Sequence, residues 1–129
     1  MLHDPLADAL TNLKNYERSG KNDCIIKPAS NLTKNILLAM QETGYIGSFE
    51  RIDDGRAGKF TVKLTGKINN CGVIKPRYSV KLSEIESWEK KYLPAREFGV
   101  LLISTPYGVM THSKAKQKKT GGVLLAYVY

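Results

Sequence analysis

The stretch VLLISTPYGVMTHSKAKQKKTGG, residues 100–122, decides the fold of the C-terminal part of this chain. It predicts a short apolar strand over residues 99–103, a tight turn at Ser104–Gly108 and a second short strand at Val109-Met110. A lysine-rich segment follows. Gly121-Gly122 then indicates a turn or a close backbone contact, because glycine has no Cβ to obstruct a neighbouring backbone.

Positive charge is concentrated in two segments of the chain. The 129 residues include 20 Lys and Arg against 12 Asp and Glu, which gives a net charge of +8. No acidic residue occurs from Gly55 to Ser83 or from Phe98 to Tyr129. Such segments predict one or two cationic faces and a polyanionic partner, most often nucleic acid. A basic surface that serves only solubility is the alternative.

The N-terminal half predicts a lobe with the order α-β-α-β-β. Its first helix begins at Asp4-Pro5, an N-cap followed by proline at the first helical position, and ends at Gly20. A short strand over residues 24–27 comes next and stops at Pro28. The residues of the first helix that we expect to be buried are Leu6, Ala9, Leu10 and Leu13.

A second helix and a hairpin complete this lobe. Ser30 is expected to cap the helix, and Gly44 to end it. Two strands, over residues 45–52 and 59–64, flank Asp53-Asp54-Gly55-Arg56, where a turn is a far stronger interpretation than a cation site. The helix residues that we expect to be buried are Leu32, Ile36, Leu37, Ala39 and Met40.

A basic connection from Gly66 to Pro76 is expected to lead into a second lobe. A strand is predicted over residues 77–82. Ser83 is expected to cap a short helix that carries acidic residues in its first turn, where the helix dipole favours them. Leu93-Pro94 ends this helix.

The second lobe is expected to be mostly β with short helices. After the strand and turn of residues 99–108, a short helix is predicted near residues 113–118 and a terminal strand over residues 123–129. The chain as a whole is therefore predicted to be an α+β protein of two small lobes, residues 1–66 and 67–129.

Residues suited to catalysis are scarce. The two histidines are His3 and His112, and a Ser104–His112 pair has no nearby acid in the sequence to complete a triad. No glycine motif for nucleotide phosphates is present. We therefore expect no enzymatic activity and no cofactor.

The two cysteines and the hydropathy of the chain bear on its environment. Cys24 and Cys71 lie far apart and form no zinc-ligand spacing, so we expect reduced, partly buried thiols. No apolar run approaches the roughly 18 residues of a membrane span, and no signal peptide precedes Asp4. These features predict a cytoplasmic protein that does not contact a membrane.

RNA suits the hydroxyl-rich turn better than duplex DNA does. Serine and threonine hydroxyls can reach base edges, ribose hydroxyls or phosphates, and RNA is read mainly through its shape and 2′-hydroxyls. No helix-turn-helix pattern or long basic helix is present. Trp88 and most tyrosines are expected to be packing residues, whereas Tyr107 lies in the turn itself.

The polar face of the first helix leaves two interpretations open. Thr11 and Asn15 lie on this face, and Lys34 is expected to be nearby on the second helix. These side chains either contact RNA or form a plain solvated face.

Short blocks along the chain resemble the small-subunit ribosomal protein S8 family. They occur in the expected order at residues 4–11 (DPLADALT), 27–30 (KPAS), 44–46 (GYI), 103–111 (ISTPYGVMT) and 121–129. Further segments are similar to the archaeal and eukaryotic branch, at residues 53–59, 71–77 and 93–95. The chain is identified as a member of this family by resemblance.

The resemblance implies two α+β lobes and a structural role in the small ribosomal subunit. It implies direct binding to a helix in the central domain of small-subunit ribosomal RNA early in assembly, beside neighbouring small-subunit proteins. Many members also bind a mimic of that site in their own messenger RNA. An RNA-binding or protein-binding adaptor outside the ribosome is the alternative.

The resemblance also assigns RNA contact to the Ser-Thr turn, here Ser104, Thr105 and Gly108. Bacterial members usually have Ser-Lys between the threonine and the glycine, whereas this chain has Pro106-Tyr107. A lysine that could bind phosphate is thus absent, and the rigid Pro106 and the aromatic ring of Tyr107 occupy these two positions. With the residues singled out above, the expected RNA contacts are Ser104, Thr105, Tyr107, Gly108, Thr11, Asn15, Lys34 and Lys116.

Overall fold

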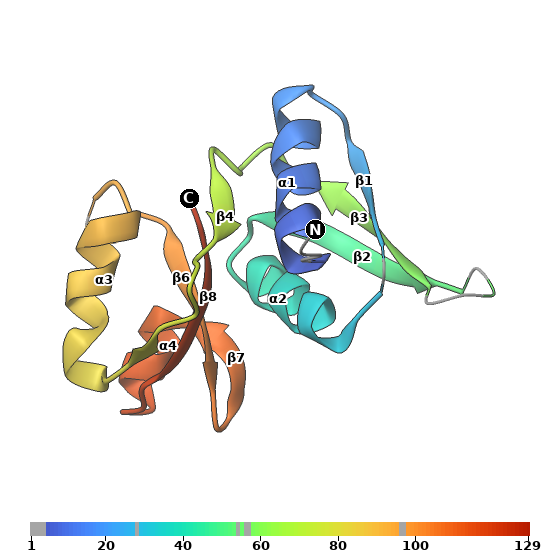
Figure 1. The fold of residues 1–129 in the computed structure, drawn as a ribbon. Helices are drawn as coiled ribbons and strands as arrows, with labels where there is room; N and C mark the ends of the chain where they lie inside the picture. The colour runs from blue at the N-terminus through green and yellow to red at the C-terminus, as the bar shows by residue number, and fades with distance from the viewer. Residues whose placement is uncertain (1–4, 28, 54, 56–57, 96–97) are drawn as a thin grey trace. The chain divides into compact units, whose positions relative to one another are not determined.

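The computed structural model describes residues 5–27, 29–53, 55, 58–95 and 98–129 (Figure 1). The chain divides into two units, Met1–Cys71 and Gly72–Tyr129. Each unit combines helices with antiparallel strands, which confirms the predicted α+β class. The expected lobe boundary between residues 66 and 67 stays a prediction.

The first helix of the first unit, α1 (Pro5–Arg18), has the predicted buried face. The side chains of Leu6, Ala9, Leu10 and Leu13 are at most 2% exposed. Gly20 follows the helix with φ +73°, a left-handed conformation that favours glycine and ends the helix as predicted. The predicted N-cap Asp4 lies outside the described residues.

The second helix, α2 (Asn31–Glu42), begins and ends as predicted. The Ser30 hydroxyl accepts a hydrogen bond from the Thr33 N–H at 3.1 Å, and Gly44 follows the helix with φ +85°. The predicted buried face was wrong at one position, because Thr33 is buried and Leu32 only half-buried. Thr33 lies three residues before Ile36 on the buried face, and its hydroxyl accepts a hydrogen bond from Ser30.

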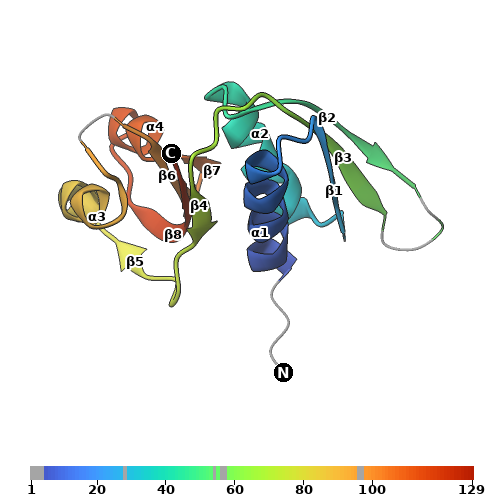
Figure 2. The ribbon, with the colours of Figure 1, turned by 90° about the horizontal axis from the view of Figure 1, so that it is seen from above.

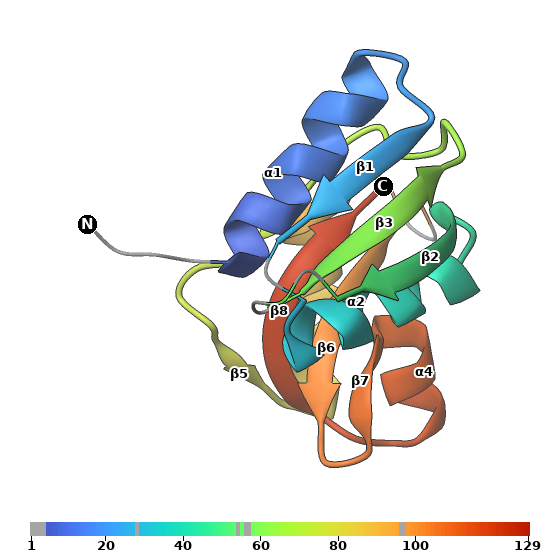
Figure 3. The same ribbon diagram turned by 90° about the vertical axis from the view of Figure 1, so that its right-hand side faces the viewer.

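The helices α1 and α2 cover one face of a three-stranded sheet, and Figure 3 shows the opposite face. Its strands are β1 (Asp23–Ile26), β2 (Ile46–Ile52) and β3 (Lys59–Leu64), in the order β1-β3-β2 and all antiparallel. This arrangement confirms the predicted α-β-α-β-β lobe and its hairpin. The Asp53 carboxylate accepts a hydrogen bond from the Gly55 N–H at 3.1 Å, as expected in a turn. Pro28, Asp54 and Arg56 lie outside the described residues.

Five strands form the second sheet, which belongs to the second unit except for Cys71, the first residue of β4. They are β4 (Cys71–Val73), β5 (Ser79–Val80), β6 (Val100–Thr105), β7 (Gly108–Thr111) and β8 (Gly122–Val128). Four of them follow the order β4-β8-β6-β7, and β5 also pairs with β8 (Figure 2).

Two predictions for this sheet were wrong in detail. The segment expected to be a connection contains β4, and the strand expected over residues 77–82 is reduced to β5. Both short strands lie along the long strand β8, which provides hydrogen-bond partners to each. Pro76 stands between them and has no backbone N–H to donate to a strand ladder.

Helices cover one face of this second sheet. After a short 3-10 turn (Leu82–Glu84), α3 (Ile85–Tyr92) and α4 (His112–Gln117) pack on the sheet. The prediction that Ser83 caps α3 was wrong, because Ser83 lies inside the 3-10 turn. In this turn the Lys81 N–H donates a hydrogen bond to the Glu84 carboxylate at 2.9 Å. The buried core consists of Ile74, Val80, Ile85, Leu93, Leu101, Ile103, Met110, Ala115 and Leu124.

Most aromatic residues of the second unit are packing residues, as predicted. Trp88, Tyr92, Tyr127 and Tyr129 are partly buried against the core. The rings of Trp88 and Tyr92 stack with centroids 6.1 Å apart, and those of Tyr92 and Tyr127 with centroids 5.6 Å apart. Such contacts serve packing through buried area.

Both cysteines are free and buried. Burial raises the pKa of each thiol to about 11, so the thiols stay protonated near neutral pH. Cys71 lies against the first helix, where its thiol donates to the Leu10 carbonyl at 3.4 Å. No helix within the described ranges is long and apolar enough to cross a membrane.

Candidate functional site

The β6–β7 hairpin carries the central group of predicted site residues. Its strands are joined by a two-residue turn, Pro106-Tyr107, which is shorter than the predicted turn. Ser104 pairs with Val109 and Thr105 pairs with Gly108, so these positions belong to the strands. Gly108 has φ +116°, a conformation that residues with a Cβ rarely adopt, and this explains the glycine that closes the turn.

The Thr105 hydroxyl holds the hairpin together. It donates to the Gly108 carbonyl at 2.8 Å and accepts from the Tyr107 N–H at 3.1 Å. The residue is only 9% exposed. This hydroxyl therefore stabilises the turn from within, and the predicted RNA contact by Thr105 stays a prediction.

The side chain of Ser104 has different surroundings. Ser104 is half-buried and alternates with Ile103 and Thr105, so it points to the other face of the sheet. Within the part of the chain that the structure describes, its hydroxyl has no hydrogen-bond partner. Ser104 thus has a hydroxyl that is available to a ligand.

Tyr107 is strongly exposed in the turn of the hairpin. Its residue exposure is 68%, and the Lys118 ammonium lies 5.3 Å from the centroid of its ring. A cation over an aromatic face is held by the ring quadrupole. Sequence reasoning noted the lysine-rich segment but could not tell which lysine meets the ring, because only the packing of α4 decides it.

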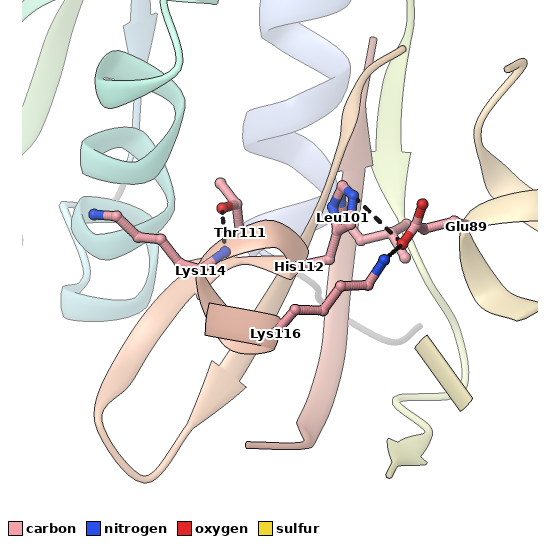
Figure 4. Close-up of polar contacts among 6 residues, drawn as sticks. All are labelled: Glu89, Leu101, Thr111, His112, Lys114 and Lys116. Carbon is pink, nitrogen blue, oxygen red and sulfur yellow. Dashed lines mark hydrogen bonds and ion pairs between the residues drawn. The ribbon is translucent and has the colours of Figure 1, made fainter. Parts of the chain in front are cut away.

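Lys116 is engaged in an ion pair. Its ammonium donates to the Glu89 carboxylate of α3, and its side chain is 37% exposed. Figure 4 shows Lys114 and Lys116 leaving α4 in opposite directions. The predicted phosphate contact by Lys116 stays a prediction, and Glu89 already compensates part of its charge.

His112 belongs to the same cluster and is 4% exposed. Its Nδ1 accepts from the Leu101 N–H at 3.0 Å, and its Nε2 lies 3.7 Å from the Glu89 carboxylate (Figure 4). The neutral ring therefore carries its proton on Nε2. Because both nitrogens face these partners, His112 is not arranged as a general base for Ser104. The sequence near His112 contains no acidic residue, and Glu89 of α3 is the acid that lies beside it in the structure.

The cluster lines a cavity of about 900 Å³ between α3, α4 and the start of β6. Glu86 and Lys90 contribute further charges, and Leu93 and Val100 contribute apolar surface. Acidic and basic side chains are mixed in this lining. The cavity therefore lacks the uniform positive charge that a polyanion requires.

We expect the stability of the second unit to decrease as pH falls below about 6.5. Burial lowers the pKa of His112, and the positive charge of Lys116 lowers it further. The negative charge of Glu89 raises the pKa, but the net shift is downward. The unfolded chain then binds more protons than the folded chain below the unfolded pKa, so acid favours unfolding. Urea unfolding between pH 7.5 and 5.5, followed by the fluorescence of the single Trp88, measures this effect.

The variant His112→Gln removes the titrating group and should flatten this pH dependence. His3→Gln removes the other histidine of the sequence and is the matched control, for which the wild-type dependence should remain. Identical pH dependence in His112→Gln and the wild type would contradict the prediction.

The remaining predicted contacts belong to the first unit. Thr11 and Asn15 are exposed on α1, and Lys34 is exposed on α2. Thr11 also lines a groove of about 460 Å³, to which Asn12 of α1 and Ile25 of β1 contribute. The structure thus places the predicted site residues in two groups, one in each unit.

The described residues include no cluster of three or more His, Cys, Asp or Glu that could hold a metal ion. The side chains of the β6–β7 hairpin are suited to binding a ligand. It offers a hydroxyl, an aromatic ring and a cation, which together suit ribose, bases and phosphate.

Comparisons with known proteins agree with these features. Residues 4–129 match the family described as Ribosomal protein S8. The chain is similar to the small ribosomal subunit protein uS8 of Methanococcoides burtonii, strain DSM 6242. The two are 54% identical over 129 residues, which cover 100% of this chain and 99% of that protein.

Proposed function

The chain belongs to the ribosomal protein S8 family, and on this premise we propose that it binds a helix in the central domain of small-subunit ribosomal RNA early in assembly. It is a structural protein of the small ribosomal subunit that binds ribosomal RNA, and it is not an enzyme. We propose that other small-subunit ribosomal proteins are its neighbours. The same surface would also bind a mimic of the site in the protein's own messenger RNA.

The observation that carries this proposal is the exposed ring of Tyr107 beside the Lys118 ammonium. The acid-free segment Phe98–Tyr129 surrounds both residues. Tyr107 would stack on a base or ribose, Lys118 would approach a phosphate, and Ser104 would hydrogen-bond a sugar or base. Thr105 would act by holding the turn, and Gly108 by letting the RNA backbone approach closely.

A second contact is proposed for the first unit. Thr11 and Asn15 lie on the exposed face of α1, away from its buried leucines. Lys34 contributes a positive charge from α2. Polar side chains of this kind contact sugars and phosphates without reading sequence. Lys116 would add attraction to RNA of any sequence.

Tyr107→Ala should weaken binding to the cognate RNA by about 1–2 kcal/mol, because base–aromatic stacking is lost. Tyr107→Phe is the matched variant and should bind almost normally, since it keeps the ring. Filter binding at one salt concentration compares three RNAs: a central-domain fragment, a fragment from another domain and a random sequence.

The proposed function requires that the wild type prefer the central-domain fragment and that Tyr107→Ala lose part of this preference. Equal affinity of the wild type for all three RNAs would overturn the function. Normal binding by Tyr107→Ala would overturn only the role of the ring. A transcript of the protein's own messenger RNA, tested in the same assay, addresses the feedback proposal.

A further inference from the structure

Four partly exposed residues form a row across the sheet of the second unit. Val123 of β8 pairs with Ser79 on one side and with Ser104 on the other, and Ser104 pairs with Val109. Directly paired residues in antiparallel strands share one face of the sheet. Figure 3 shows β5, β8, β6 and β7 side by side in this order.

The row lies on the face of the sheet opposite the core. The residues that adjoin it along each strand, Val80, Leu124, Ile103 and Met110, all belong to the buried core. Side chains alternate between faces along a strand, so the row points away from that core. Ser79 is exposed, and the other three members are half-buried.

A pair of glycines allows the row to form. A Cβ on Gly122 would lie 2.2 Å from the Ser104 carbonyl oxygen, and one on Gly121 would lie 2.3 Å from the Val80 carbonyl oxygen. The missing Cβ atoms thus let β5 and β6 approach β8 closely on its two sides. Neighbouring strands lie about 4.8 Å apart, so Ser79 and Ser104 are roughly 10 Å apart.

The two serines offer the same chemistry. Neither hydroxyl has a hydrogen-bond partner within the described part of the chain. Arg77 and Lys81, both exposed, lie two residues to either side of Ser79. The row therefore presents two hydroxyls, separated by the apolar Val123, beside exposed cations.

We propose that Ser79 is a second RNA-reading hydroxyl, and that the row Ser79–Val123–Ser104–Val109 lies along the wide, shallow minor groove of an RNA helix. That groove displays 2′-hydroxyls, which both donate to and accept from serine. A row of short side chains across four strands can lie along a shallow groove, and the exposed Arg77 and Lys81 would reach phosphates beside it. This inference rests on the proposed function and extends its site from the hairpin onto β5.

The test measures affinity of the full chain for the central-domain RNA fragment by filter binding. Ser79→Ala and Ser104→Ala should each weaken binding about 3- to 10-fold, as for one lost hydrogen bond. Ser87→Ala is the matched control, because Ser87 is exposed on α3 and outside the row, and its affinity should not change. Unfolding of each variant by urea shows that the fold is intact.

A second measurement identifies the hydroxyl that is read. Random 2′-O-methylation of the RNA, followed by selection of the bound molecules, shows where methylation prevents binding. For Ser79→Ala, at least one interference position of the wild type should disappear, and it should differ from the position lost in Ser104→Ala. Loss of affinity in Ser79→Ala without such a change overturns the reading role.

The affinity measurements distinguish failure of this inference from failure of the proposed function. If Ser79→Ala binds as tightly as Ser87→Ala while the wild type still prefers the central-domain fragment, only the inference is overturned. The β5 end of the row would then contact a neighbouring protein. A wild type without that preference overturns the proposed function, and the inference falls with it.

Discussion

Raising monovalent salt from 50 to 200 mM should weaken binding to the cognate RNA by roughly 60- to 1,000-fold. Each phosphate neutralised by lysine or arginine contributes about −0.7 to −0.9 to the log–log slope, so a handful of contacts gives roughly −3 to −5. The two acid-free segments, Gly55–Ser83 and Phe98–Tyr129, supply the cations. Filter binding at four or five salt concentrations measures the slope.

Lys118→Gln provides the internal control for this prediction. Removal of one phosphate contact should make the slope shallower by about 0.7–0.9, and weaken cognate and random RNA alike. A wild-type slope near zero would contradict a phosphate-based interface. A normal slope in Lys118→Gln would show that this ammonium only stabilises the Tyr107 ring.

Gly122→Ala should destabilise the second unit by about 3 kcal/mol or more. The added Cβ would lie 2.2 Å from the Ser104 carbonyl oxygen and 2.8 Å from the Ile103 side chain. Because the Ser104 carbonyl oxygen is a backbone atom of the central strand β6, β8 can accept a methyl group only by moving away from β6. Urea unfolding followed by Trp88 fluorescence reports on this unit.

Gly20→Ala separates steric overlap from backbone strain, and its urea unfolding is followed by circular dichroism because Gly20 lies in the first unit. Gly20 has φ +73°, but no atom would lie within 4 Å of an added Cβ there. Only the cost of a left-handed residue remains, about 1–2 kcal/mol. A similar loss in both variants, or a stable Gly122→Ala, would show that the sheet accommodates the methyl group.

Local signals in the sequence determined most helices and strands. Ser30 and Gly44 bound α2, and the spacing of leucines identified the buried face of α1, because caps and periodicity act over a few residues. The same reasoning gave the hairpin of residues 46–64 and the cationic character of residues 98–129. The proposed role of Tyr107 also follows from its place in a turn.

Only the tertiary structure decided which side chains of the site meet. Thr105 turns inward to bond Gly108, Lys118 reaches Tyr107, and Glu89 joins His112 and Lys116. Ser79 comes level with Ser104 only because both strands pair with Val123. Such contacts depend on strand register and helix packing between distant segments, which no local sequence pattern specifies.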